Sequence, residues 1–498
     1  KKIMLLLSLI VLSLSSSLKA QDRLESEILL SKFGIPNFKN NLRKDKDKTV
    51  INVSDYNYPV PEKEEEGIYT IAILGTSDIH GYAFKEESFH PGTKQQYSSG
   101  GIDYLASYIK ILQGQWGDRL LWLDGGDQFQ GGFETKLSNG EVMTEFFNKL
   151  NIQSSAIGNH EFDFGQEFLK TRINKARFEY LASNIENDLH EKAFIDHMKT
   201  SSVHQVGQIK VGVIGLATLE TTITTAGDLT GFNFLDYVPS IISESKKLKK
   251  QSVDVILLTS HIGTVCKNLD INENKLRYYK PEVEEECNIQ KEEMNKLIEK
   301  LVKEEEKDGV TYLHGIVAGH THSNTHHYIK GKPVVSTGMA GRYFNIMYLK
   351  FKNIGDSYQL IKEDTVIEGP VPVCEKLFEN TKTCYGIDDN DLTVGTLRNF
   401  TFHKKQVFSD TSIKAILDKL HEKMKPYEEV IATTDIRLKM NWKEGDSQLA
   451  NIYTDCIREG SGADFSTTNN GGFRVEWAPG KIRKVDLYNM FPFGSKVI

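Results

Sequence analysis

The chain has 498 residues and a formal net charge of −7 at pH 7. This acidic balance argues against binding to polymeric nucleic acid through a broad basic surface. Small anionic ligands would instead have to be held by metal ions or by local arginine and lysine residues. Hydrophobic residues make up 39% and charged residues 26% of the chain, a balance typical of a globular protein with two or three domains.

The first twenty residues have the pattern of a secretory signal peptide. Lys1 and Lys2 precede an apolar block at residues 3–14, and we expect cleavage after about Ala20. The block is too short to span a membrane comfortably, and nothing later in the chain resembles a membrane span. A secreted, cell-surface or lumenal protein is therefore expected, and sequons at Asn52 and Asn399 fit a glycoprotein.

The five cysteines fit an exported chain, where disulfides persist. Cys374 and Cys384 are close enough in sequence to close a small loop, and Cys266 with Cys287 would bridge the charged segment between them. Cys456 would then be unpaired. Five free thiols are the alternative, because sequence alone does not fix the pairing.

Apolar, strand-like runs alternate with segments of helical spacing. Strands are predicted at 70–74, 119–123, 154–157, 210–216, 253–259 and 315–318, and helices at 100–111, 241–250 and 292–304. This alternation predicts an α/β fold built from right-handed βαβ units, with a largely parallel sheet or pair of sheets.

Carboxylate, amide and imidazole side chains stand just after these strands. An Asp-x-His pair such as Asp78 and His80 could by itself be a helix cap beside a surface histidine, but similar side chains follow four further strands. The set is Asp78, His80, Asp127, Asn159, His261, His320 and His322. Parallel strands place their ligands at one edge of the sheet, and these ligand types suit divalent metals. Seven of them suit two ions about 3.5–4 Å apart, with Asp127 as the bridging carboxylate.

The ordered motifs D-x-H, G-D-x-x-x-G, G-N-H-E, H and G-H-x-H, between residues 68 and 351, resemble the calcineurin-like metallophosphoesterase superfamily. Their longer forms SDIHG, GGDQFQGG, GNHEFDFG and GHTH are similar to its 5′-nucleotidase branch. The resemblance implies a metallophosphoesterase β-sandwich flanked by helices (αββα) and two divalent metal ions. Zn²⁺ is favoured in an exported protein rich in imidazole ligands, with Mn²⁺, Co²⁺ or Fe as alternatives.

The resemblance also implies a role for each residue. Asp78, His80, Asp127 and His322 would hold one metal, and Asp127, Asn159, His261 and His320 the other. His160 and Asp163 would form a catalytic dyad in which Asp163 orients the imidazole. His160 would stabilise charge on the transferring phosphoryl group or protonate the leaving oxygen. The alternative for Asp163 is a helix N-cap at the turn into residues 164–169.

The last part of the chain contains LANIYTD, GADFSTTNNGGFR and FPFG, which resemble the opening of the 5′-nucleotidase C-terminal domain. By that likeness Asn469 and Arg474 would contact the substrate and Phe493 would stack on a nucleobase. The alternatives are a surface cation for Arg474 and a core aromatic for Phe493. A helix at 412–425 and a strand at 430–438 are also predicted here.

We therefore predict a signal peptide at 1–20, a polar segment at 21–67, a catalytic domain at 68–368, a linker at 369–407 and an incomplete α/β substrate-binding domain at 408–498. The predicted function is hydrolysis of nucleoside 5′-monophosphates to nucleoside and phosphate by metal-activated water. A nucleotide-sugar diphosphatase or a cyclic-nucleotide phosphodiesterase is the alternative with the same chemistry. A non-catalytic binding or structural protein is the alternative of another class. The expected partner is a small nucleotide, and the oligomeric state stays open.

Overall fold

The structure is a computed structural model that describes residues 51–52, 65–90, 92–266, 275–279, 292–384, 392–440 and 447–493. The predicted signal peptide and most of the polar segment at 21–67 lie outside the described residues. Residues 50–498 group as one unit.

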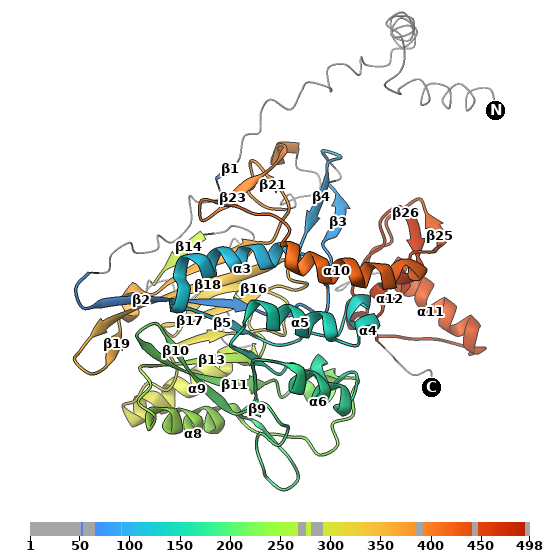
Figure 1. Cartoon of the computed structure of the whole chain (residues 1–498). Helices are drawn as coiled ribbons and strands as arrows, with labels where there is room; N and C mark the ends of the chain where they lie inside the picture. The colour runs from blue at the N-terminus through green and yellow to red at the C-terminus, as the bar shows by residue number, and fades with distance from the viewer. Residues whose placement is uncertain are drawn as a thin grey trace, which may run out of the picture. The chain divides into compact units, whose positions relative to one another are not determined.

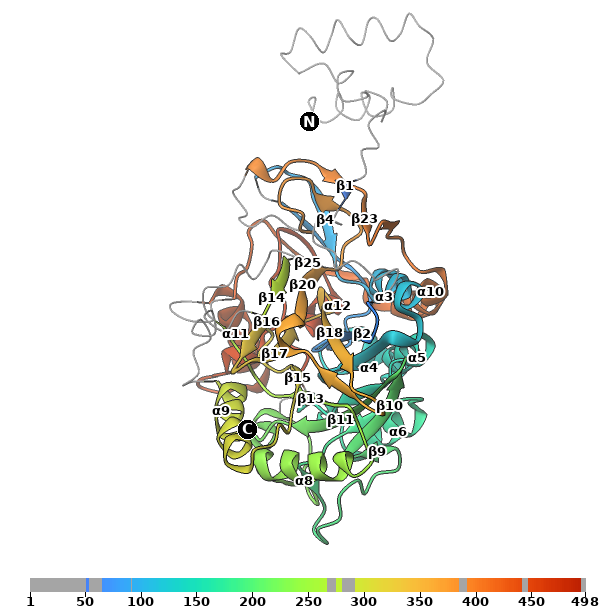
Figure 2. The ribbon, with the colours of Figure 1, turned by 90° about the vertical axis from the view of Figure 1, so that its left-hand side faces the viewer.

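Two β-sheets form the centre of this unit (Figures 1 and 2). The first runs in the order β14 (Lys275–Tyr278), β20 (Val366–Pro372), β18 (Tyr343–Asn353), β2 (Ile68–Thr76), β5 (Leu120–Asp124), β6 (Ser154–Ala156), β7 (Glu179–Leu181) and β9 (Met198–Lys199). The second runs in the order β10 (Ser201–Val206), β11 (Ile209–Ala217), β13 (Val255–His261), β15 (Gly315–Val317), β17 (Lys332–Thr337) and β16 (Asn324–Ile329). Strands β2, β5, β6 and β7 are parallel neighbours, as are β11, β13 and β15.

Successive side chains of a strand point to opposite faces of its sheet, so one set packs between the two sheets and the other packs against the helices. Ile71 and Ile73 of β2 pack between the sheets with Leu257 of β13, whereas Ala72 and Leu74 face the helices on the other side. The outer face of the first sheet is covered by α3 (Ile102–Trp116), α5 (Glu141–Leu150) and α6 (Gln166–Lys175). The outer face of the second is covered by α8 (Tyr237–Lys249) and α9 (Glu293–Asp308), as Figure 1 shows. The predicted αββα sandwich is confirmed.

One predicted boundary falls inside a strand. The segment 369–372 contains two prolines and was expected to begin a linker, but it is the end of β20, which is buried throughout and pairs with β18. The ladder shifts register between Phe344 and Ile346, so the β20 residues Gly369 and Pro370 lie at an irregularity of the pairing. Proline is tolerated at such places because no ladder hydrogen bond is required of it.

The cysteines follow the prediction where the structure describes them. Cys374 and Cys384 form a disulfide, and Cys456 is free and exposed. Cys266 is disulfide-bonded as well, while its predicted partner Cys287 lies outside the described residues.

The C-terminal part of the chain is joined to the sandwich by helix α10 (Thr411–Met424). The apolar side chains Ile413 and Leu417 of α10 belong to the same core as α3. Beyond it, α11 (Gln448–Ser461), the ribbon of β25 (Val430–Thr434) with β26 (Gly480–Arg483), and α12 (Lys484–Met490) surround a smaller core that includes Leu449, Phe473 and Trp477. The strand predicted at 430–438 is therefore shorter. Among the described residues, no helix is long and apolar enough to cross a membrane.

The layer between the sheets should dominate stability. Leu257 is fully buried there, so Leu257→Ala is expected to lower the free energy of unfolding by about 2–5 kcal/mol through lost burial and a cavity. Leu189 is 76% exposed, so the matched variant Leu189→Ala should change it by less than about 0.5 kcal/mol. Urea unfolding of both variants measures the difference, and equal stability would contradict this view of the core.

Candidate metal centre

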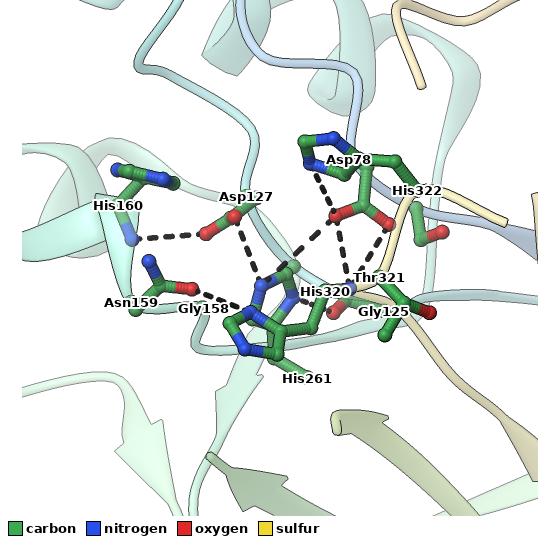
Figure 3. Close-up of polar contacts among 12 residues, drawn as sticks. Asp78, Gly125, Asp127, Gly158, Asn159, His160, His261, His320, Thr321 and His322 are labelled. Atoms are coloured by element: carbon green, nitrogen blue, oxygen red, sulfur yellow. Dashed lines mark hydrogen bonds and ion pairs between the residues drawn. The ribbon is translucent and has the colours of Figure 1, made fainter. Parts of the chain in front are cut away.

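Four predicted ligands meet where three strands end, and Figure 3 shows three of them, Asp78, Asp127 and His322. Asp78 and His80 follow β2, Asp127 follows β5 and His322 follows β15, and one ligand atom of each lies within 4.8 Å of the others. His80 Nε2 lies 2.7 Å from His322 Nε2 and 3.7 Å from Asp127 Oδ2. Asp78, His80 and Asp127 are buried.

The other three predicted ligands adjoin the same carboxylate. His261 Nε2 lies 2.9 Å from Asp127 Oδ2, and His320 Nδ1 lies 3.1 Å from Asn159 Oδ1. Oδ2 of Asp127 therefore reaches histidines of both groups, while its Oδ1 accepts a hydrogen bond from the backbone N–H of His160. The structure brings all seven predicted ligands together.

The imidazoles are oriented as metal ligands are. His80 Nδ1 donates to the carbonyl of Gln130 at 2.6 Å, and His261 Nδ1 donates to the carbonyl of Gly125 at 2.7 Å. Nε2 of each ring therefore faces the cluster, and once deprotonated it can bind a cation there. Within the described residues, His261 Nε2 is buried without a hydrogen-bond partner, since its approach to Asp127 lacks the angles of a hydrogen bond. Converging nitrogen and oxygen lone pairs fit divalent cations.

The backbone at this edge adopts a conformation that non-glycine residues avoid. Five of the seven residues have positive φ: Asp78 (53°), His80 (52°), Asp127 (57°), His320 (81°) and His322 (54°). Each such residue costs roughly 1–2 kcal/mol relative to the right-handed region. Strain of this kind persists where the surrounding structure enforces it, which is typical of functional sites.

The predicted dyad is formed next to the cluster. His160 Nδ1 lies 2.6 Å from Asp163 Oδ2. Asp163 Oδ1 accepts from Thr225 Oγ1 at 2.7 Å and from the backbone N–H of Ala226 at 2.9 Å. The alternative of a helix N-cap at Asp163 is wrong, because the N-cap of α6 is Gly165 and the carboxylate is engaged elsewhere.

Two of the three predicted substrate-binding residues lie at this dyad. Arg474 Nη2 is 3.3 Å from His160 Nε2, and the rings of Phe493 and His160 are 5.6 Å apart. The guanidinium of Arg474 lies 5.0 Å from the centre of the Phe493 ring. Asn469 is exposed, and its side-chain oxygen accepts from the backbone N–H of Gly472 at 2.9 Å, so it supports a turn.

Two known protein families match parts of this chain. The calcineurin-like phosphoesterase family matches residues 71–324, and the 5′-nucleotidase C-terminal domain matches residues 430–498. The chain belongs to the calcineurin-like phosphoesterase family. The resemblance predicted from the motifs is confirmed, including that to the 5′-nucleotidase branch.

Three proteins illustrate the similarity. A snake venom 5′-nucleotidase of Gloydius brevicauda is 30% identical over 200 residues, which cover 40% of this chain and 34% of that protein. Protein UshA of Yersinia enterocolitica is 25% identical over 476 residues, covering 87% of this chain and 74% of that protein. The crystal structure of a 5′-nucleotidase precursor from Thermus thermophilus has a TM-score of 0.62 at 19% identity, covers 86% of this chain and 74% of that one, and shows a shared fold.

The chain spans only part of many relatives. Four curated relatives, the venom protein among them, are matched over 34% to 37% of their own length.

Glycines let the phosphoesterase ligands approach closely. A Cβ atom on Gly158 would lie 2.1 Å from Asp127 Oδ1, and one on Gly319 would lie 2.9 Å from His261 Nδ1. Any side chain at either position would therefore displace a predicted ligand.

The surroundings of the two carboxylates in the cluster shift their pKa values in opposite directions. Burial raises the pKa of Asp78 to about 7. Burial also opposes ionisation of Asp127, yet the neighbouring His261 and His160 hold its pKa well below the usual range. Burial lowers the pKa of His80 to about 3, which keeps this imidazole neutral. Although burial lowers it, the carboxylate of Asp127 raises the pKa of His261 to about 10. The anionic Asp127 and the neutral His80 are in the forms that bind a cation, whereas a cation bound at His261 would displace the proton of its Nε2.

A buried glutamate without a predicted role supports the turn that carries Asp127. Glu161 is fully buried; its Oε2 accepts from the backbone N–H of Asp127 at 2.9 Å and of Gly158 at 2.6 Å, and its Oε1 accepts from that of Gln128 at 2.6 Å. Its place in the GNHEFDFG motif was the only signal available.

Replacing Glu161 should therefore loosen the turn that carries Asp127. In Glu161→Gln an amide NH₂ faces backbone N–H groups, so the free energy of unfolding should fall by about 1–3 kcal/mol. Glu167 is 89% exposed, so Glu167→Gln should leave it unchanged. Urea unfolding of both variants tests this, and equal stability would show that the three hydrogen bonds are dispensable.

Proposed function

We propose that this phosphoesterase hydrolyses phosphate monoesters, and in particular nucleoside 5′-monophosphates, to nucleoside and phosphate. The observation that carries this proposal is the position of Arg474 and Phe493 at His160, beside the seven ligands. A guanidinium and an aromatic ring at one end of a metal cluster suit a ligand with a phosphate and a flat base. The names of the similar 5′-nucleotidases support the same substrate class.

The residues present fit two divalent cations, with Zn²⁺ favoured by the imidazole content. Asp78, His80, Asp127 and His322 would hold one, and Asp127, Asn159, His261 and His320 the other. When bound, such ions activate water and neutralise charge on phosphate oxygens. The pattern of residues 1–20 further supports export of the protein.

The chain's own residues would then direct the bond cleavage. Hydrolysis joins a water oxygen to phosphorus and breaks the bond between phosphorus and the ribose oxygen, which takes up a proton. His160 is tied through Nδ1 to Asp163, so its Nε2 is fixed toward Arg474. In this position His160 can stabilise the phosphoryl charge or protonate the leaving oxygen. Arg474 would hold the phosphate, and Phe493 the base.

Substrate class is tested by phosphate release from AMP, by formation of UMP and glucose 1-phosphate from UDP-glucose, and by formation of 2′- or 3′-AMP from 2′,3′-cAMP. Release of p-nitrophenol from bis-p-nitrophenyl phosphate measures generic diester hydrolysis. The purified protein is supplied with Zn²⁺ or Mn²⁺, and Asp127→Asn serves as the control. We expect AMP to be the best substrate and activity to be lost in the control. A preference for UDP-glucose or 2′,3′-cAMP would replace the nucleotidase assignment, and bound metal without any turnover would favour a binding protein.

Recognition of the base is tested separately at Phe493. Stacking on an aromatic ring is worth about 1–3 kcal/mol per base, so Phe493→Ala should lower kcat/KM for AMP by about 10-fold or more. Ribose 5-phosphate lacks the base, and its hydrolysis should hardly change. Phe465, on the same C-terminal part, is 78% exposed, and Phe465→Ala is the matched control. An equal loss with both substrates would contradict a base-stacking role.

A further inference from the structure

Three of the four imidazoles in the metal centre are oriented by an acceptor on their other ring nitrogen. For His80 and His261 this acceptor is a backbone carbonyl, which no substitution removes. For His320 it is a side chain, because His320 Nε2 lies 2.9 Å from Glu220 Oε2. A carboxylate only accepts, so Nε2 donates its proton to Glu220, and Nδ1 faces Asn159 Oδ1 (Figure 3). Because this amide oxygen also only accepts, Nδ1 and Oδ1 are placed as two ligands of one cation would be.

We propose that Glu220 is a positioning residue for the metal site formed by Asp127, Asn159, His261 and His320, and that its loop also orients the dyad. Outer carboxylates of this kind fix the tautomer and ring orientation of a ligating histidine and raise its basicity. The inference rests on the metal centre proposed above. It concerns residues 218–226, to which the sequence analysis assigned no role.

The loop is held firmly enough to position other groups. It begins directly after β11, where Thr218 Oγ1 donates to Glu293 Oε2 at 2.9 Å. The next backbone N–H, of Leu219, donates to the hydroxyl of Tyr237 at 2.6 Å. The loop is thus anchored to the first residues of both α8 and α9, although the Glu220 side chain itself is 52% exposed.

The same loop reaches the dyad at its other end. Thr225 Oγ1 and the backbone N–H of Ala226 both donate to Asp163 Oδ1, at 2.7 Å and 2.9 Å. A Cβ atom on the following Gly227 would lie 2.0 Å from the carbonyl oxygen of Phe162. One short segment therefore supports a predicted metal ligand and the carboxylate that orients His160.

The Glu220 contact is tested by metal affinity. The full-length chain and its variants are dialysed against buffered free Zn²⁺ over a range of concentrations, and bound zinc per chain is measured by elemental analysis. We expect two ions in the unaltered chain, and in Glu220→Ala a weakening of about 10–100-fold for one ion only. Glu220→Gln keeps an oxygen that can accept from Nε2, so the loss should be smaller. Melting of the metal-free chains should be unchanged.

Glu186→Ala is the matched control, because Glu186 Oε1 and His190 Nδ1 form a similar pair at 2.5 Å with His190 82% exposed. It should bind two ions with unchanged affinity. Equal zinc affinity in Glu220→Ala and in the unaltered chain would overturn this inference alone. An unaltered chain that binds no zinc would overturn the proposed metal centre as well.

The dyad contact is tested with Thr225→Val, which removes the hydroxyl while keeping the shape. Zinc content should stay at two ions, whereas kcat for AMP should fall about 10-fold or more, but by no more than the ~10²–10⁴ that a positioned acid or base contributes. KM should change little. Thr222 bonds only within the loop, to Leu219 O at 3.1 Å, so Thr222→Val is the control. An unchanged kcat in Thr225→Val would overturn this half of the inference.

Discussion

The convergence of seven ligand side chains from separate strand ends is the constraint on which the rest of the structure depends. Buried imidazoles and carboxylates this close together are costly without a cation among them, and five left-handed residues add backbone strain. The sandwich can enforce this arrangement because both sheets are apolar and buried on their inner faces. Buried acceptors such as Glu161 then fix the turn that carries Asp127.

The residues proposed to bind the substrate, Arg474 and Phe493, come from a different part of the chain. Helix α10 shares the core of the sandwich, and the C-terminal segment is held to the turn after β5 by two hydrogen bonds. Gln130 Nε2 donates to the carbonyl of Pro492 at 3.0 Å, and the backbone N–H of Phe133 donates to Asn489 Oδ1 at 3.0 Å. These contacts bring Arg474 to His160. The sandwich would thus carry the metal ligands and the dyad, and the C-terminal part would select the substrate. Residues 218–226 contact both the predicted ligand His320 and the dyad residue Asp163.

The sequence predicts a structural feature well where the residues that form it are close together in the chain. Strands such as β2 and β5, and the ligands after them, stand in continuous motifs, so their positions could be read directly and the αββα fold followed from the resemblance. The supporting roles of Glu161 and Glu220 depend on backbone groups and a histidine brought close only by folding, so no linear pattern indicated them. Residues 369–372 were misread because two prolines are typical of a linker, whereas here they occupy an irregular end of β20.

The central claim is that two cations share Asp127. It is tested most directly by anomalous X-ray diffraction from crystals of the protein grown with Zn²⁺ and measured at the zinc absorption edge. Two anomalous peaks about 3.5–4 Å apart are expected. One should lie among Asp78, His80 and His322, and the other among Asn159, His261 and His320. A single peak, or peaks that lie away from Asp127, would contradict it.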